Sequence, residues 1–145
     1  MFAMSVVTGF LTILLMIMTS YLNLVSANAA AQILAEAGGH LAIYSSYVSS
    51  YAQANPGYTG SVSDVSAALP TWFTRQAGEK NYVTGGVAYV YTVPTNRAAG
   101  MAMARTVTGG AAGIDDSGSL TSPGQGASGQ LVPAAVPSGA MVIIR

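Results

Sequence analysis

The sequence has no cysteine, a single histidine and very few charged side chains. Its 145 residues include five Lys or Arg and five Asp or Glu, so the formal net charge is zero. Without cysteine the chain can form neither a disulfide framework nor a thiolate nucleophile. It also has no cluster of basic residues to supply the phosphate contacts on which nucleic-acid binding depends. We therefore expect no nucleic-acid partner.

Residues that carry catalytic or metal chemistry are equally sparse. His40 is the single histidine, which excludes a two-histidine metal site, and a packed, hydrogen-bonded role is favoured for it. Asp115 and Asp116 lie in a glycine-rich stretch, where a solvated turn is favoured over a calcium site. A small exported hydrolase using His40 and a serine is the enzymatic alternative, but no G-x-S-x-G elbow is present. We expect no enzyme activity, metal, cofactor or small-molecule substrate.

Apolar residues, in contrast, are abundant and make up 51% of the chain. No charged side chain precedes Glu36, and residues 2–25 are predominantly apolar. Such a run covers the ~30 Å hydrocarbon core of a bilayer at ~1.5 Å per residue. We predict a transmembrane helix over residues 1–26, with lipid contacts through residues 2–25. Because residues 26–74 contain no Lys or Arg, the expected orientation has a cytoplasmic N-terminus and a translocated C-terminal domain.

The helical pattern continues beyond the apolar run. Apolar residues recur every three or four positions, which indicates one face of a helix: Ile33, Ala37, Leu41, Tyr44, Val48 and Tyr51. We predict one helix from Phe2 to Ala54, with residues 27–55 as its amphipathic continuation and Gly38-Gly39 as its weak point. Pro56 and Gly57 end it. A signal peptide cleaved after Ala27-Asn28-Ala29 is the alternative, although a basic n-region is missing and the apolar run is long.

Residues 56–145 predict a head of mixed helix and strand. The patterns indicate a short helix over 62–69, a hairpin of 81–83 with 86–93, and a helix over 96–105 capped by Thr95, with strand as its alternative. Residues 109–139 are rich in Gly, Ser and Pro and predict a long connection that includes two short strands. Residues 140–145 predict a buried strand that ends the sheet. The expected fold is α+β and pilin-like, with the long helix packed on a small antiparallel sheet.

The "LPTWF" stretch contains the candidate interaction residues, Trp72 and Phe73. The favoured interpretation makes both residues core plugs that cover the apolar face of the long helix. The alternative interpretation makes them an exposed binding anchor.

The order of helix and head resembles the type IV pilin architecture, but the processing signature of pilins is missing. If Gly9-Phe10 were the cleavage junction, Leu14 would stand where pilins carry Glu, and the leader would contain no Lys or Arg. A mature pilin subunit is therefore disfavoured, and we expect Met1 and Phe2 to be retained.

Several segments together resemble the PilM family of type IVb, conjugative thin-pilus systems, which is unrelated to the actin-like protein of the same name. They are the apolar N-terminus, "ANAAAQILAEAGGHLAIYSSYVSSYA", "LPTWF", "GIDDSGSLTSPGQGASG" and "LVPAAVPSGAMVIIR". The resemblance covers the whole chain. It implies a bacterial inner-membrane protein with a periplasmic head that contacts other pilus-biogenesis proteins or pilin subunits, and it carries over no catalytic residue. A minor pilin-like subunit incorporated into the filament is the alternative.

Overall fold

The chain forms one long helix followed by a mixed helix and strand domain. The computed structural model describes residues 2–145 and the side chains of residues 11–145. Met1, the Gly9-Phe10 junction and the first part of the predicted lipid-contacting run therefore lie outside the described side chains. By its contacts the chain divides into two compact units, residues 1–33 and residues 34–145. We call the second unit the head.

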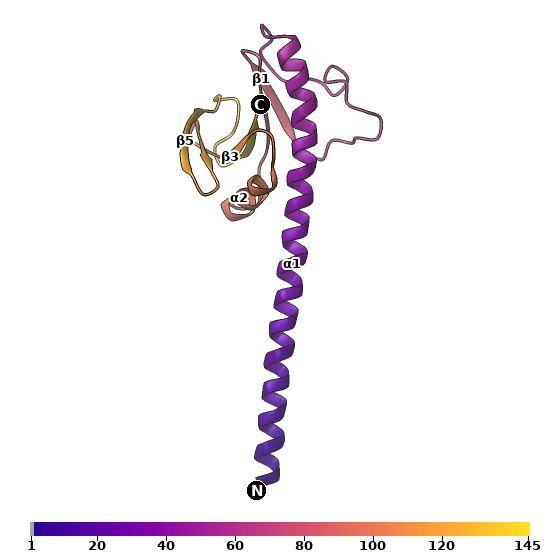
Figure 1. The fold of residues 1–145 in the computed structure, drawn as a ribbon, viewed down its shortest axis with the longest axis vertical. Coiled ribbons are helices and arrows are strands. Elements are labelled where there is room, and N and C mark those ends of the chain that lie inside the picture. The colour runs from indigo at the N-terminus through magenta and orange to yellow at the C-terminus, as the bar shows by residue number, and fades with distance from the viewer. Residues whose placement is uncertain (1) are drawn as a thin grey trace. The chain divides into compact units, whose positions relative to one another are not determined.

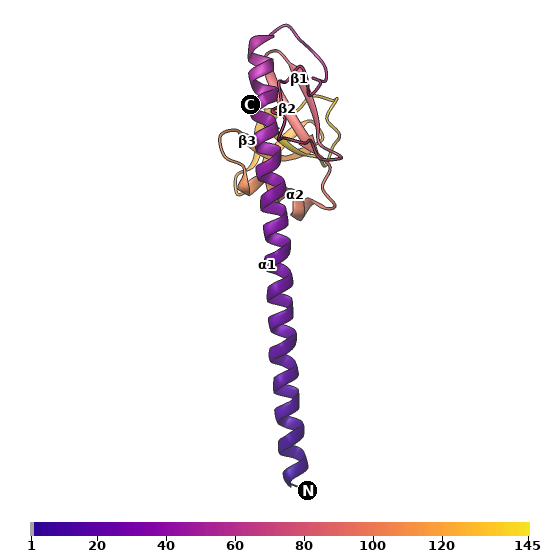
Figure 2. The ribbon, with the colours of Figure 1, turned by 90° about the vertical axis from the view of Figure 1, so that its right-hand side faces the viewer.

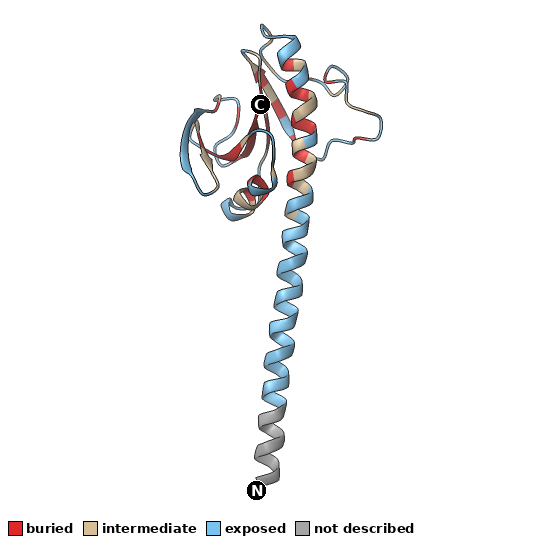
Figure 3. Cartoon of the chain, viewed as in Figure 1, coloured by how far each residue is buried: buried red, intermediate tan, exposed pale blue. Residues whose placement is uncertain are grey.

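Helix α1 spans Phe2–Ala54 as one α-helix, which confirms the predicted continuous helix and its end before Pro56. It continues through Gly38 and Gly39, where we expected a weak point. Every side chain from Leu11 to Ile33 is exposed, as Figure 3 shows. The helix is long and apolar enough to cross a membrane, by length and composition. Ile33 is 66% exposed, so the predicted buried face begins later, at Ala37.

The head contains a six-stranded antiparallel sheet, which confirms the predicted α+β class (Figures 1 and 2). Its strands are β1 (Lys80–Thr84), β2 (Val87–Thr92), β3 (Ala111–Asp116), β4 (Ser119–Ser122), β5 (Gly126–Leu131) and β6 (Met141–Ile144). Their spatial order is β1-β2-β6-β3-β4-β5. The C-terminal strand β6 is buried as predicted, but it does not end the sheet, because it pairs with both β2 and β3.

The predicted hairpin and the predicted second helix are both present. Gly85 and Gly86 connect β1 to β2 with φ of +58° and +76°, values that glycine adopts without the strain a side chain would add. Helix α2 spans Arg97–Thr106, so the strand alternative is wrong there. Its cap is Asn96, whose side chain accepts a hydrogen bond from the backbone N–H of Ala99. The prediction of Thr95 as the cap was wrong by one residue.

Two predictions about irregular segments were wrong. Residues 62–69 form turns and not a helix, and Ala68 adopts a φ of +52°, which a right-handed helix does not allow. The stretch 109–139 is not a long connection, because it contains β3, β4 and β5. Its glycine content reflects close packing and tight turns. A Cβ on Gly113 of β3 would collide with the Thr121 carbonyl oxygen, so glycine lets these two backbones approach each other.

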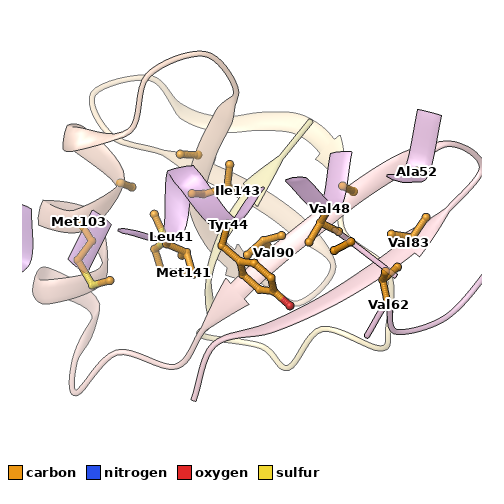
Figure 4. Close-up of a cluster of buried hydrophobic side chains, with 14 of the residues drawn as sticks. Leu41, Tyr44, Val48, Ala52, Val62, Val83, Val90, Met103, Met141 and Ile143 are labelled. Atoms are coloured by element: carbon orange, nitrogen blue, oxygen red, sulfur yellow. The ribbon is translucent and has the colours of Figure 1, made fainter. Parts of the chain in front are cut away.

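The head buries apolar side chains on both faces of the sheet. On one face, residues of α1 and α2 pack against the strands, and Figure 4 shows the centre of this cluster, with Leu41, Tyr44 and Val48 of α1 beside Val90 and Ile143. On the other face, the segment after β5 folds back over the sheet. It contributes Val132 and Val136, which pack with Leu120, Val142 and Ile144. The sheet is therefore the middle layer of the head.

An exposed ion pair joins α2 to β3 and gives a pH-dependent prediction. Arg97 donates to both carboxylate oxygens of Asp116 at 2.5 and 2.8 Å, and Thr121 donates to the same carboxylate at 2.6 Å. These bonds lower the pKa of Asp116 from 3.8 to about 2. A carboxylate with a lowered pKa stabilises the fold above its unfolded pKa, and that contribution is lost as the pH falls from about 4 to about 2.

We expect Asp116→Asn to lower the thermal unfolding midpoint slightly at pH 7 and by a smaller amount at pH 2, where about half of the Asp116 carboxyl groups are protonated. The side chains of Arg97 and Asp116 are 54% and 44% exposed, so solvent screens the pair and the loss is small. Thermal unfolding followed by circular dichroism at both pH values measures the difference. High salt should also reduce it at pH 7. A loss of equal size at pH 7 and pH 2 would show that the ion pair contributes nothing.

Candidate interaction surface

Residues 61–79, which form most of the segment between α1 and β1, are fixed to α1 by Phe73. This side chain is 8% exposed and belongs to the main apolar cluster. Its ring stacks on His40 with centroids 4.4 Å apart and lies 6.1 Å from the ring of Tyr44. The predicted role of Phe73 as a core plug over the helix is therefore confirmed.

Trp72 lies on the outside of the same segment. Its side chain is 69% exposed and meets Phe73 edge-on, with centroids 6.0 Å apart and planes at 77°. The core-plug prediction was wrong for Trp72, because neighbouring side chains diverge from the backbone and Phe73 already fills the position over α1. An exposed indole supported by a buried ring agrees with the alternative interpretation of an exposed anchor.

A buried carboxylate holds the end of this segment on α1. Glu79 is 6% exposed, and its Oε1 lies 2.8 Å from Nδ1 of His40. The other oxygen, Oε2, accepts a hydrogen bond from the Gln76 backbone N–H at 2.9 Å. His40 is thus packed and hydrogen-bonded, as predicted. The role of Glu79 was missed, since its partner lies 39 positions away and no local pattern marks the pair.

A second buried group holds the start of the segment. The backbone N–H of Val62 donates to Oδ1 of Asn81 at 2.7 Å, and Nδ2 of Asn81 donates to the Val62 carbonyl at 2.8 Å. Nδ2 also donates to the hydroxyl of Tyr44. Burial raises the pKa of the Tyr44 phenol, so it stays neutral and accepts this bond. Asn81 on β1 therefore ties α1 to the loop through one amide.

Beside Phe73 the segment forms an open groove of about 380 Å³. Leu69, Pro70 and Phe73 are among its lining residues, and Arg75 pairs with Asp64 across it at 3.3 Å. Val65 at its rim is 91% exposed. Trp72 is not among the residues that line the groove, but it is exposed on the same segment. Exposed tryptophan side chains are enriched at protein contact sites.

The predicted acidic pair does not form a solvated turn. Asp115 is 2% exposed within β3, and its Oδ1 accepts from the Gly118 N–H at 2.8 Å, which shapes the turn into β4. Asp116 pairs with Arg97. Among the described residues, no three His, Asp or Glu side chains gather as metal ligands would.

Comparison with known proteins identifies the family. The sequence matches the family model for PilM over residues 6–144, almost the whole chain. The chain belongs to the PilM family. This confirms the resemblance found in the sequence and makes the chain a pilus-related protein.

One solved structure and the curated proteins complete the comparison. A crystal structure of a protein from Pseudomonas aeruginosa 2192, provisionally named pilM, is similar to this chain at 28% sequence identity with a TM-score of 0.48. The similarity covers 76% of this chain and 92% of that one. None of the curated proteins matches this PilM chain.

Proposed function

We propose that this PilM protein is a non-enzymatic, single-pass inner-membrane component of the type IVb, conjugative thin-pilus assembly apparatus. Its head would face the periplasm and bind other assembly proteins or pilin subunits. The observation that carries the proposal is the family match over residues 6–144. The match spans both the apolar helix and the head, so it supports a role that uses the two together.

The properties of α1 support the membrane part of the proposal. All side chains from Leu11 to Ile33 are exposed, and the large apolar ones among them have no protein partner to bury them. Transfer of each such side chain from water to hydrocarbon contributes roughly 1.5–3 kcal/mol, so the segment strongly favours lipid. The absence of Lys and Arg from residues 26–74 favours export of the head.

The use of polar groups in the head supports a non-enzymatic role. The buried Glu79 holds His40, the buried Asn81 holds Val62 and Tyr44, and the buried Asp115 shapes a turn. The hydrogen bonds that these side chains make go to other groups of the protein and hold its structure. A catalytic acid or base moves a proton to or from a substrate, and the atoms that make these hydrogen bonds are already engaged.

Intact mass spectrometry of the chain extracted from purified inner membranes tests the proposal. We expect the full mass from Met1, with or without formylation, and resistance of the chain to alkaline extraction. Protease added to spheroplasts should cleave the head, because it faces the periplasm.

The competing roles predict different masses. Loss of residues up to Gly9, together with recovery of the chain in sheared filaments, would identify a minor pilin-like subunit and contradict the assembly role. Loss through Ala29 would identify a secreted protein. A head protected from protease in spheroplasts but cleaved in inverted vesicles would reverse the proposed orientation.

A further inference from the structure

A second hollow of the head lies beside the turn that joins β3 to β4. It has a volume of about 330 Å³ and is formed by that turn and by the segment that follows β5. Two hydrogen bonds join its sides. The Val132 N–H donates to the Gly118 carbonyl at 2.9 Å. The Ser117 N–H donates to the Ser138 hydroxyl at 3.2 Å. The hollow is therefore built into the fold, and a ligand would find it already formed. We call it the Asp115 hollow, after the one charged residue among the described residues that line it.

The Asp115 carboxylate is buried, yet within the described residues only one of its oxygens has a partner. The residue is 2% exposed, and Oδ1 accepts a hydrogen bond from the Gly118 N–H at 2.8 Å. Among the described residues, none donates to Oδ2 and none forms an ion pair with the carboxylate. Oδ2 is also not one of the polar atoms that are closed off from solvent without a partner, so it reaches the hollow. Burial of a carboxylate is costly unless donors or an opposite charge replace its water, so Oδ2 favours a positively charged donor.

The other walls of the Asp115 hollow are mainly apolar. Val132 and Val136 are buried and belong to the apolar cluster on this face of the sheet. Pro133 and Pro137 also line the hollow, and their rings fix the backbone φ, which limits movement of the walls. A ligand that matches these walls carries an apolar stem behind its charged head.

We propose that the Asp115 hollow binds a lysine side chain of a partner protein. The ammonium group donates to Oδ2 of Asp115, and the methylene stem packs against the valine and proline walls. This inference rests on the proposed function in one respect, namely that the head binds another protein.

The geometry favours lysine over other cations. Arginine binds a carboxylate best through two parallel hydrogen bonds to both oxygens, and Oδ1 is already engaged with Gly118. The lysine ammonium is a compact point charge, for which a single free oxygen is enough. A calcium ion takes about six to eight oxygen ligands, whereas among the described residues Asp115 is the one carboxylate that lines the hollow.

Proton–nitrogen NMR spectra of the full chain in detergent micelles test the proposal, with N-acetyl-lysine methylamide as the probe. We expect saturable shifts of the Ser117, Gly118 and Ser138 amide signals at millimolar probe. The same probe with its ammonium acetylated is neutral and should cause no saturable shift, and the arginine counterpart should bind more weakly. Equal shifts from the charged and the acetylated probe, no shift from either, or tighter binding of the arginine counterpart would overturn the proposal.

Asp115→Asn and Asp116→Asn form a matched pair of variants. Asp115→Asn keeps an oxygen for the Gly118 N–H but removes the charge, so we expect about tenfold weaker binding of the probe. Asp116 does not line the hollow and pairs with Arg97, so Asp116→Asn should leave the affinity unchanged. Equal losses in the two variants would show a general effect of charge and overturn the assigned site. The comparison of probes on the parent chain decides the question even if Asp115→Asn does not fold.

The source of the lysine is tested separately, because the chain's own lysine, Lys80, is exposed and makes a second copy the competing donor. If the Ser117 and Gly118 signals shifted with rising protein concentration and Lys80→Gln abolished that shift, the partner assignment would be wrong. Absence of probe binding would refute this inference and leave the membrane-bound assembly role intact. Recovery of the chain in sheared filaments would contradict that role and leave the lysine site in place.

Discussion

Gly38→Leu is expected to lower the free energy of unfolding of the head by about 3 kcal/mol, through overpacking between α1 and α2. A Cβ at this position would lie 2.8 Å from the Met103 carbonyl oxygen and closer still to the Thr106 hydroxyl, which donates to that carbonyl. One of the two obstacles is backbone, so α2 as a whole must move. Urea unfolding of the full chain in detergent micelles, followed by Trp72 emission, measures the loss.

Gly39→Leu is the matched control for this prediction. It introduces the same side chain one position along α1, where a Cβ would meet nothing within 4 Å. Leu is also a better helix former than Gly by up to ~1 kcal/mol, so we expect stability within about 1 kcal/mol of the parent. Adding Thr106→Ala to Gly38→Leu should recover only part of the loss, because the Met103 carbonyl stays. Equal effects at Gly38 and Gly39 would show that helix flexibility, and not close packing, accounts for the glycines.

The contrast between these glycines shows what a sequence pattern can predict. The spacing of apolar residues in α1 correctly predicted one helix ending before Pro56, because helical periodicity is local information. The same pattern could not predict why position 38 requires glycine. The reason is the close approach of the Met103 carbonyl oxygen, and Met103 lies 65 positions further along the chain. The β1–β2 hairpin was predicted for the same local reason, from alternating apolar residues beside Gly85-Gly86.

The stretch 109–139 shows the opposite case. Glycine, serine and proline ordinarily indicate coil, yet here they build β3, β4 and β5. Gly113 suits a strand because the Thr121 backbone lies too close for a side chain. This requirement exists only after the strands have paired, so composition alone gives the wrong answer.

The candidate surface was predicted in part. The sequence singled out Trp72 and Phe73, and the structure separates them into an exposed indole and a buried ring. Adjacent aromatic residues carry no information about which one faces the core. The supporting groups Glu79 and Asn81 escaped notice, because buried polar residues are recognisable only from their partners, and those partners lie on α1 and in the loop.

Asn81→Ala tests how much one such group contributes. The substitution leaves the Val62 N–H, the Val62 carbonyl and the Tyr44 hydroxyl without the bonds that Asn81 supplies. Each buried polar group left unpaired costs roughly 1–3 kcal/mol, so we expect a loss of about 3 kcal/mol or more. Tyr44→Phe is the comparison, because it removes one of the three bonds and keeps both bonds to Val62, and it should cost about 1 kcal/mol.

The same urea titration in detergent micelles ranks these two variants, and Trp72 emission before the transition adds a second readout. Val62 and Phe73 belong to one loop, so release of Val62 should loosen the loop and change the surroundings of Trp72 in Asn81→Ala but not in Tyr44→Phe. If both variants lost the same small amount of stability, the bonds to Val62 would contribute little. The loop would then be held on α1 by the His40–Glu79 pair and by its buried apolar side chains, Phe73 among them.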